Sequence, residues 1–360
     1  MGEQLTERIK MIPVKNIYYM LSYAFRLLQE NGYQKVGTED FDNTAELFAA
    51  ILIQGITLAV KRGLGREYVE ETDATTQPRG KIDLTETVRS RSIIKKQLVC
   101  TYDEFSVNNR MNQIVKSTGL LLLRSGLSIQ RRQKLRHLLM YFAEVDEIEL
   151  RRVDWHFRYS RNNQNYRLLI SVCRLLCHGL LQTQEHGSLK LMDFQDSQEM
   201  HALYERFLLA YYRRTFPALQ ANASYIPWQL DDDVDTFFPA MKTDITLSDG
   251  HKTLIIDAKY YASNILQSQF EKKSIRSGHL YQIFAYVKNK AATMKENPQN
   301  VSGLLLYAGT DEEITPNQTY SMSGNHIGVE TLDLNQDFSE IKAHLDRIVM
   351  DYFEIERTGM

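Results

Sequence analysis

Two runs of β-forming residues joined by an Asp-Gly turn constrain the C-terminal half of this chain more than any other feature. The first run is Met241-Lys-Thr-Asp-Ile-Thr-Leu247, and the second is Thr253-Leu-Ile-Ile-Asp-Ala-Lys-Tyr260. Asp-Gly between two such runs is a strong hairpin signal. The aliphatic and β-branched stretch Thr253–Ile256 favours a buried central strand. We therefore expect a sheet built around this hairpin.

Three ionisable residues lie on the hairpin: Asp244 on the first run, and Asp257 and Lys259 at the end of the second. Side chains two positions apart in a strand point the same way, so Asp257 and Lys259 share a face. A register that pairs Leu247 with Leu254 would place Asp244 opposite Asp257, with Cβ atoms about 4.5–5.5 Å apart. Two carboxylates this close repel each other unless a proton or a cation lies between them.

This group of charges has a chemical interpretation and an ordinary one. Carboxylate oxygens are ligands that Mg²⁺ prefers, and a bound divalent ion can acidify a water molecule and stabilise charge on a phosphoryl oxygen. Lys259 could orient that water or neutralise the phosphate. The pattern favours metal-dependent phosphodiester hydrolysis, and a surface Asp–Lys pair at a strand end is the alternative.

Helical patterns flank the hairpin and carry further polar residues. A helix over residues 199–215 carries Glu205, which is either a solvated carboxylate or part of the site. A helix over residues 277–290 carries Gln282 and Tyr286, which are four apart and share a face. This pair is either a polar edge of the core or a gate beside the metal and the scissile strand.

The N-terminal half has helical patterns interrupted by a small β-rich element. Helices are expected over residues 17–29, 46–61, 109–123, 129–142 and 166–181, and β-leaning runs over 68–71, 81–84 and 97–102. A polar segment at 183–191 marks the expected domain boundary. The expected architecture is an α+β N-terminal domain, residues 1–188, with an insert at about 66–106, followed by an α/β domain, residues 189–360.

Charge is balanced over the whole chain and uneven within it. Lys and Arg total 43 and Asp and Glu total 45, so any contact with nucleic acid requires a local basic patch. Residues 79–136 contain thirteen basic residues and four acidic ones. This excess forms either solvated faces or a surface for DNA phosphates or for an acidic partner protein.

The cysteines and apolar runs exclude several classes of protein. Three cysteines, Cys100, Cys173 and Cys177, do not suggest a disulfide framework. Cys173 and Cys177 are four apart in an apolar helical stretch, which favours core positions over zinc ligation. The longest apolar run, residues 47–60, is shorter than the roughly 20 residues that span a bilayer. We expect a cytoplasmic protein without membrane contact.

The charged hairpin and its flanking helices resemble a known superfamily. Asp244 followed by Asp257-Ala258-Lys259 is similar to the motif of PD-(D/E)XK nucleases, with Thr243 where the motif has proline. Gln282-x-x-x-Tyr286 is similar to the QxxxY extension of RecB-like members, and Glu205 matches an acidic residue on their first helix.

The resemblance implies a restriction-endonuclease-like α/β domain and a role for each of these residues. Asp244 and Asp257 would hold Mg²⁺, with Glu205 as a candidate third ligand. Lys259 would be the catalytic lysine, and Gln282 and Tyr286 would complete the catalytic site.

A resemblance to the McrC family, the nuclease subunits of McrBC modification-dependent restriction systems, covers nearly the whole chain. It rests on seven segments in the same order: Ile12–Ala24, Arg79–Asp83, Ile170–Cys173, Leu203–Phe207, Thr243–Thr246, Ile256–Tyr261 and Gly303–Tyr307. Several segments in order are more specific than the catalytic motif alone.

The family resemblance implies a Mg²⁺-dependent endonuclease that cuts double-stranded DNA containing methylcytosine. It would act with a hexameric AAA+ GTPase of the McrB type, bind it and stimulate it. GTP would be bound by that partner, in agreement with the lack of a Gly-x-x-x-x-Gly-Lys-Ser/Thr phosphate loop in this sequence. The basic insert is the candidate contact with the partner, through Arg79, Lys81, Arg89 and Arg91.

Two other functions remain open from the sequence. One is a non-catalytic adaptor and GTPase activator built on a nuclease-like scaffold. The other is a stand-alone nuclease, which would need its own specificity element, and the sequence contains no zinc finger or clear helix-turn-helix.

Overall fold

The computed structural model describes residues 12–25, 28, 33, 36, 39, 41, 43–161, 163–183, 198–232, 236–260, 266–269, 272–294, 297–309 and 316–355. The chain forms two compact units. One unit is continuous, from residue 30 to 192, and the other combines residues 1–29 with residues 193–360.

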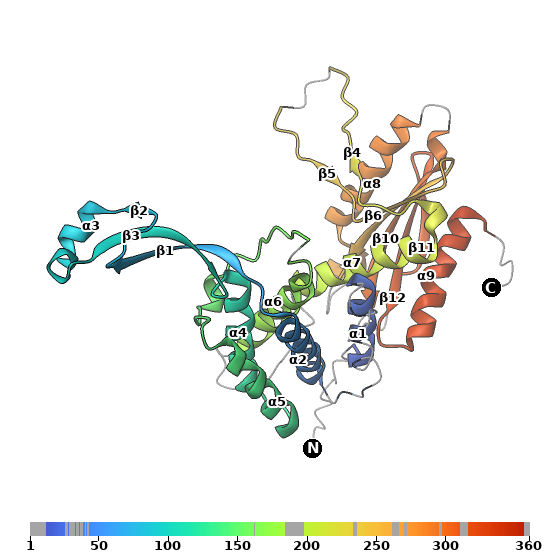
Figure 1. The fold of residues 1–360 in the computed structure, drawn as a ribbon. Helices are drawn as coiled ribbons and strands as arrows, with labels where there is room; N and C mark the ends of the chain where they lie inside the picture. The colour runs from blue at the N-terminus through green and yellow to red at the C-terminus, as the bar shows by residue number, and fades with distance from the viewer. Residues whose placement is uncertain are drawn as a thin grey trace. The chain divides into compact units, whose positions relative to one another are not determined.

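The continuous unit contains a bundle of four helices (Figure 1). They are α2 (Thr44–Arg62), α4 (Arg110–Leu123), α5 (Ile129–Leu139) and α6 (Tyr166–Thr183). Short 3₁₀ turns follow at Met140–Phe142 and Leu150–Arg152. Cys173 and Cys177 are buried on α6 as free thiols, which confirms core positions for them.

Helix α2 is the core of this bundle. Its residues from Ala45 to Ile53 are all buried, as expected for a helix whose apolar side chains nearly encircle it. Among the described residues it is the one helix that is long and apolar enough to cross a membrane. However, 61% of its apolar window is buried within the protein, which is typical of the core helix of a soluble protein.

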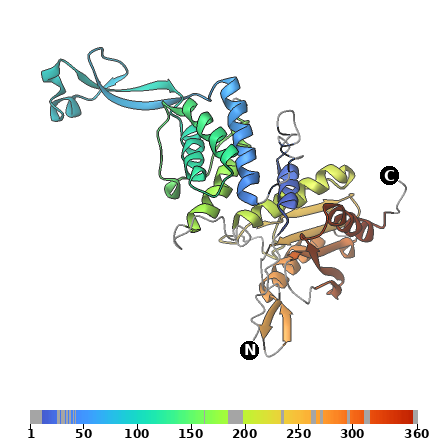
Figure 2. The same ribbon diagram turned by 90° about the horizontal axis from the view of Figure 1, so that it is seen from below.

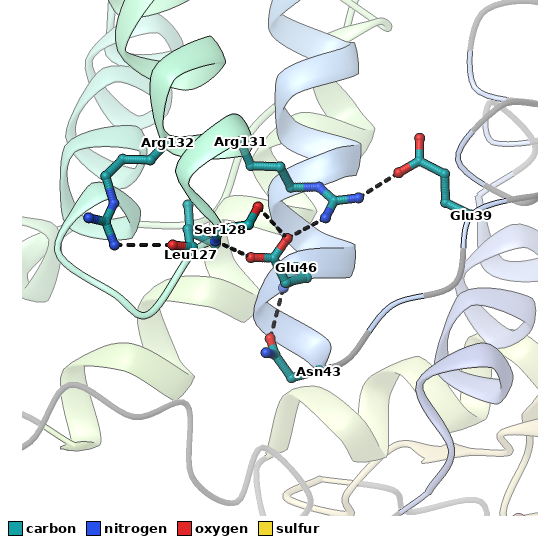
Figure 3. A network of polar contacts seen from close by, with 7 residues as sticks. All are labelled: Glu39, Asn43, Glu46, Leu127, Ser128, Arg131 and Arg132. Carbon is teal, nitrogen blue, oxygen red and sulfur yellow. Dashed lines mark hydrogen bonds and ion pairs between the residues drawn. The ribbon is translucent and has the colours of Figure 1, made fainter.

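A buried carboxylate ties α2 to the start of α5 (Figure 3). Glu46 accepts a 2.6 Å hydrogen bond from the Ser128 backbone N–H and pairs with Arg131, which also pairs with Glu39. Burial alone would raise the pKa of Glu46, but the hydrogen bonds from Ser128 and Arg131 outweigh it and lower that pKa. The charge is therefore retained at neutral pH, and it fixes the packing of the two helices.

The insert extends from this bundle as an arm (Figures 1 and 2). Its three antiparallel strands are β1 (Glu67–Thr75), β2 (Lys81–Ile82) and β3 (Leu98–Ser106), in the order β1-β3-β2. The sequence predicted only strands here, but α3 (Leu84–Arg89) and a 3₁₀ turn (Ser92–Lys95) lie between β2 and β3. The predicted strand at 81–84 ends early because Asp83 caps α3 through the Glu86 backbone N–H.

The other unit is built on a mixed five-stranded sheet in the order β11-β12-β10-β7-β6. Its strands are β6 (Ile245–Ser248), β7 (Thr253–Lys259), β10 (Val301–Gly309), β11 (Gln318–Met322) and β12 (Asn325–Asp333). The three central strands β7, β10 and β12 are parallel, and the edge strands β6 and β11 run antiparallel to their neighbours. The combination of helices with a mixed sheet confirms the predicted mixed α and β character.

Helices cover both faces of the sheet. Helix α8 (Ser277–Thr293) packs on the face that carries Ile255, Leu305 and Tyr307. Helices α7 (Gln198–Thr215) and α9 (Phe338–Phe353) are joined by a 2.6 Å hydrogen bond from Tyr211 to Asp346.

Shorter elements complete this unit. They are a 3₁₀ turn at Pro217–Leu219, the pair β4 (Tyr225–Ile226) and β5 (Met241–Lys242), the pair β8 (Leu266–Gln269) and β9 (Lys272–Ile275), and a 3₁₀ turn at Pro298–Asn300.

The division of the chain differs from the predicted one at its N-terminus. Helix α1 (Val14–Ala24) belongs with the sheet, although residues 1–188 were expected to form one domain. Tyr19 stacks on Phe338 of α9 at 4.4 Å between ring centroids, and Asn16 donates to the Leu334 carbonyl. These contacts span more than 300 residues of sequence, and no local pattern indicates them.

Candidate active site

The hairpin of β6 and β7 has the predicted register. Leu247 lies opposite Leu254, and the ladder ends where Ile245 lies opposite Ile256. The first predicted run, residues 241–247, is divided between β5 and β6, and Asp244 directly precedes β6. Asp244 Oδ2 accepts a 2.9 Å hydrogen bond from the Ala258 backbone N–H, which holds its carboxyl group at the end of β7.

Asp257 and Lys259 form a buried ion pair on β7. Lys259 Nζ lies 2.8 Å from Asp257 Oδ2, and the two side chains are 11% and 2% exposed. The Lys259 ammonium group therefore offsets part of the buried charge on Asp257 Oδ2. An acceptor oxygen buried in this way is costly unless another group satisfies it.

The carboxyl groups of Asp244 and Asp257 are close enough to perturb each other. Burial raises the pKa of Asp244 well above its ordinary value, and the charges of Asp257 and Glu205 raise it further. Burial also raises the pKa of Asp257, although the nearby Lys259 opposes this. The site therefore favours a proton or a cation between the carboxyl groups.

Lys259 is linked to α8 by a chain of hydrogen bonds. Its ammonium group donates to Gln282 Oε1 at 3.0 Å, and Gln282 Nε2 donates to the Tyr286 hydroxyl at 2.9 Å. Tyr286 in turn donates to the Lys242 carbonyl at 3.1 Å. The structure therefore brings Gln282 and Tyr286 to Lys259, which the sequence left open.

Glu205 lies on α7. It is close enough to the carboxyl pair for its charge to raise the pKa of Asp244. It is one-third exposed, and its Oε1 atom is 2.8 Å from His201 Nδ1. The hydrogen bond with Glu205 raises the pKa of His201, and the charge of Asp244 adds to this effect. His201 was not predicted from the sequence, although its four-residue spacing from Glu205 on one helix was a visible signal.

The two buried carboxyl groups fit a hard divalent cation. Across the described ranges, no group of three or more His, Cys, Asp or Glu side chains is arranged as a complete metal site. Mg²⁺ usually keeps several water ligands and binds protein through one or two carboxylates, so a pair suffices. A cation would also offset the repulsion between the two carboxyl groups. Asp244 and Asp257 are therefore the residues that could hold Mg²⁺.

Replacing Asp244 with asparagine should stabilise the metal-free protein. The folded-state pKa of Asp244 is raised, so the stability of the wild type falls as pH rises from the ordinary Asp range through that raised value. At pH 7–8 the free energy of unfolding of Asp244→Asn should be about 1–3 kcal/mol higher than that of the wild type. This difference should vanish near pH 4. Urea denaturation at both pH values measures this effect.

Added Mg²⁺ provides the control for this prediction, because a ligand that binds only the folded state stabilises it. Mg²⁺ should raise the denaturation midpoint of the wild type and have little effect on Asp244→Asn. If Asp244→Asn were less stable than the wild type at pH 8 without metal, the proposed repulsion between the two carboxyl groups would be excluded.

Of the four basic residues singled out on the insert, Lys81 lies on β2, Arg79 lies between β1 and β2, and Arg89 and Arg91 lie at the end of α3 and just after it. The Arg79 guanidinium stacks 3.5 Å above the centre of the Tyr102 ring and pairs with Glu104 at 3.8 Å. Arg89 pairs with Glu86 at 3.7 Å on α3. Lys81 of β2 lies opposite Thr101 of β3. Arg91 directly precedes the 3₁₀ turn at Ser92–Lys95.

An apolar group on the tip of the insert was missed by the sequence analysis. Four aliphatic side chains there are 59–76% exposed: Leu84, Val88, Ile93 and Ile94. Leu84 and Val88 are four apart on α3, so they share a face. We call these four residues the apolar tip. Exposed aliphatic side chains clustered among basic residues are typical of a protein-binding surface.

Three comparisons relate the chain to known proteins. Residues 6–308 match the family described as "McrBC 5-methylcytosine restriction system component". The chain is 30% identical to the type IV methyl-directed restriction enzyme EcoKMcrBC of Escherichia coli strain K12 over 351 residues, which cover 95% of this chain and 99% of that protein. A solved assembly of Thermococcus gammatolerans McrB AAA+ hexamers with bound McrC contains a chain 18% identical to this one, with a TM-score of 0.47, covering 93% of this chain and 76% of that one.

Proposed function

The chain belongs to the family of McrBC 5-methylcytosine restriction system components, and from this premise we propose that it is the metal-dependent DNA endonuclease subunit of such a system. The sheet unit would then be a PD-(D/E)XK nuclease domain. The observation that carries the proposal is the trio of half-buried Asp244 with buried Asp257 and Lys259 at one end of strand β7. A cytoplasmic location follows from a DNA substrate.

The roles of the three residues follow from their contacts. Asp244 and Asp257 would hold Mg²⁺, which when bound supplies an acidified water molecule and stabilises charge on the phosphate. Lys259 is fixed between Asp257 and Gln282, so its ammonium group meets a phosphate at a defined position. Its positive charge offsets the charge that develops on the phosphoryl oxygens. Glu205 is a candidate third ligand, steadied by His201.

The partner would be a hexameric AAA+ GTPase of the McrB type, contacted by the insert. Support comes from the family and from the exposed tip, where apolar and basic side chains lie together. The lack of a phosphate loop in this chain assigns GTP to the partner.

Cleavage assays on methylated and unmethylated DNA test the proposal, with and without the partner GTPase and GTP. We expect Mg²⁺-dependent cutting of methylated DNA that requires all components. Stimulated GTP hydrolysis without cutting would favour the adaptor, and cutting by this chain alone would favour the stand-alone nuclease.

Variants of the insert test the partner contact. Polar replacement of Val88 and Ile94 by serine, together with Lys81→Glu and Arg91→Glu, should weaken stimulation of GTP hydrolysis at least about tenfold, because a few central residues carry most interface energy. Lys134→Glu, an exposed charge on α5 outside the insert, is the matched control and should change little. GTP turnover titrated with each variant measures the effect. Full stimulation by the insert variant would rule out this surface.

A further inference from the structure

A second polar pair lies beside Lys259 on the same face of the sheet. His279, in the first turn of α8, is joined to Tyr307 on β10 by a 2.8 Å hydrogen bond between its Nδ1 atom and the tyrosine hydroxyl. Tyr307 lies directly opposite Lys259 in the parallel register of β7 and β10. Residues opposite each other on neighbouring strands point to the same face, so the Tyr307 ring stands next to the stem of Lys259.

His279 also extends the polar face of α8 that meets the catalytic strand. Residues 279, 282 and 286 are spaced by three and four positions, so they lie on one face of the helix. Each of them is bonded to a different strand: His279 to β10, Gln282 to β7 and Tyr286 to β5. The three bonds fix α8 across the sheet, and Lys259 lies in the middle of them.

Tyr307 is well placed to transmit the position of His279. It is fully buried in the apolar cluster beneath α8, together with Ile283 and Val287. A packed ring of this kind has little freedom once its hydroxyl is bonded. Burial, together with the charges of Lys259, Arg276 and His201, lowers the pKa of His279 to about 4. The imidazole is therefore neutral at neutral pH and adds no second positive charge beside Lys259.

We infer that His279 is a positioning residue for Lys259: by holding the Tyr307 hydroxyl, it fixes the ring that lies beside the Lys259 side chain. The inference rests on the proposed function, which makes Lys259 the residue that acts on the phosphate. It assigns His279 no contact with DNA. The hydrogen bond to Tyr307 carries the effect.

Two substitutions separate this role from a direct contact with substrate. Asparagine places a polar atom near the position of Nδ1, so His279→Asn should keep the bond to Tyr307 and most of the activity. Glutamine places one near the position of Nε2, so His279→Gln should behave like His279→Ala. Tyr307→Phe removes the other partner of the bond without emptying the core. Tyr281→Ala, at an exposed position on α8, is the matched control.

Cleavage kinetics are measured on methylated DNA with the partner GTPase and GTP. His279→Ala and Tyr307→Phe should each lower kcat about tenfold and leave KM within about twofold, because the bond acts on the chemical step. The double variant should be no slower than either single variant, since both remove one interaction. Retained activity in His279→Gln with lost activity in His279→Asn would overturn the inference in favour of a substrate contact.

Hydrogen exchange of α8 gives a readout that does not depend on cleavage. The backbone amides of Gln282 and Ile283 should exchange faster in His279→Ala and at the wild-type rate in His279→Asn. Unchanged exchange in His279→Ala would overturn the inference even if the chain cuts no DNA. A wild type that cuts no DNA, with faster exchange in His279→Ala, would overturn the nuclease proposal and leave the His279–Tyr307 contact supported.

Discussion

Replacing Asp257 with asparagine is expected to reduce cleavage of methylated DNA by about 10³-fold, because removing one charge-stabilising group from an active site typically has an effect of this size. The side chain is 2% exposed, and its Oδ2 atom lies 2.8 Å from Lys259 Nζ. Asparagine keeps its shape and removes the charge that would bind Mg²⁺. Cleavage and GTP turnover are measured together, and only cleavage should fall.

Two controls make the Asp257→Asn result decisive. Asp249→Asn changes a carboxylate in the exposed turn of the same hairpin and should cut normally. The thermal unfolding midpoint of Asp257→Asn should stay close to that of the wild type, because losing the ion pair with Lys259 is offset by removing a charge that burial disfavours. Normal cutting by a well-folded Asp257→Asn protein would exclude this hairpin as the nuclease site.

Lys259→Met should abolish cleavage to a similar extent, about 10²–10³-fold, and leave cation binding in place. Lysine is not a ligand for Mg²⁺, and methionine retains much of the apolar stem that passes Tyr307. The measurement is cleavage together with Mn²⁺ binding followed by electron paramagnetic resonance. Lys252→Met, just before the other end of β7, serves as the matched control.

The two losses differ in kind, and this difference tests the assigned roles. Asp257→Asn should lose both cutting and tight cation binding, whereas Lys259→Met should lose only cutting. If Lys259→Met cut DNA at the wild-type rate, its proposed action on the phosphate would be excluded.

The sequence predicts this hairpin well because its determinants are local. The Asp-Gly turn and the aliphatic stretch before Asp257 set the register of Leu247 with Leu254, which the structure confirms. The four-residue spacing of Gln282 and Tyr286 likewise predicts one helix face. Whether that face meets Lys259 depends on how α8 packs on the sheet, and the sequence left it open.

Features that depend on distant contacts or exposure were not predicted. Helix α1 joins the sheet unit through Tyr19 and Asn16, whose partners lie more than 300 residues away. The apolar tip of the insert was missed because only strands were predicted there, and Leu84 and Val88 share an exposed face through the unexpected helix α3. His279 was overlooked because its partner, Tyr307, lies on a strand that follows α8 in the chain.

We propose that Asp244 and Asp257 form a cation site at one end of β7. Anomalous X-ray scattering from crystals soaked in Mn²⁺ would locate a cation bound there. The predicted result is an anomalous peak within about 2.0–2.3 Å of an oxygen from each carboxylate, the distance range of small hard cations. The peak should be absent from crystals of Asp257→Asn. A peak at other residues, or no peak beside Asp244 and Asp257 at saturating Mn²⁺, would exclude these two carboxylates as the cation site.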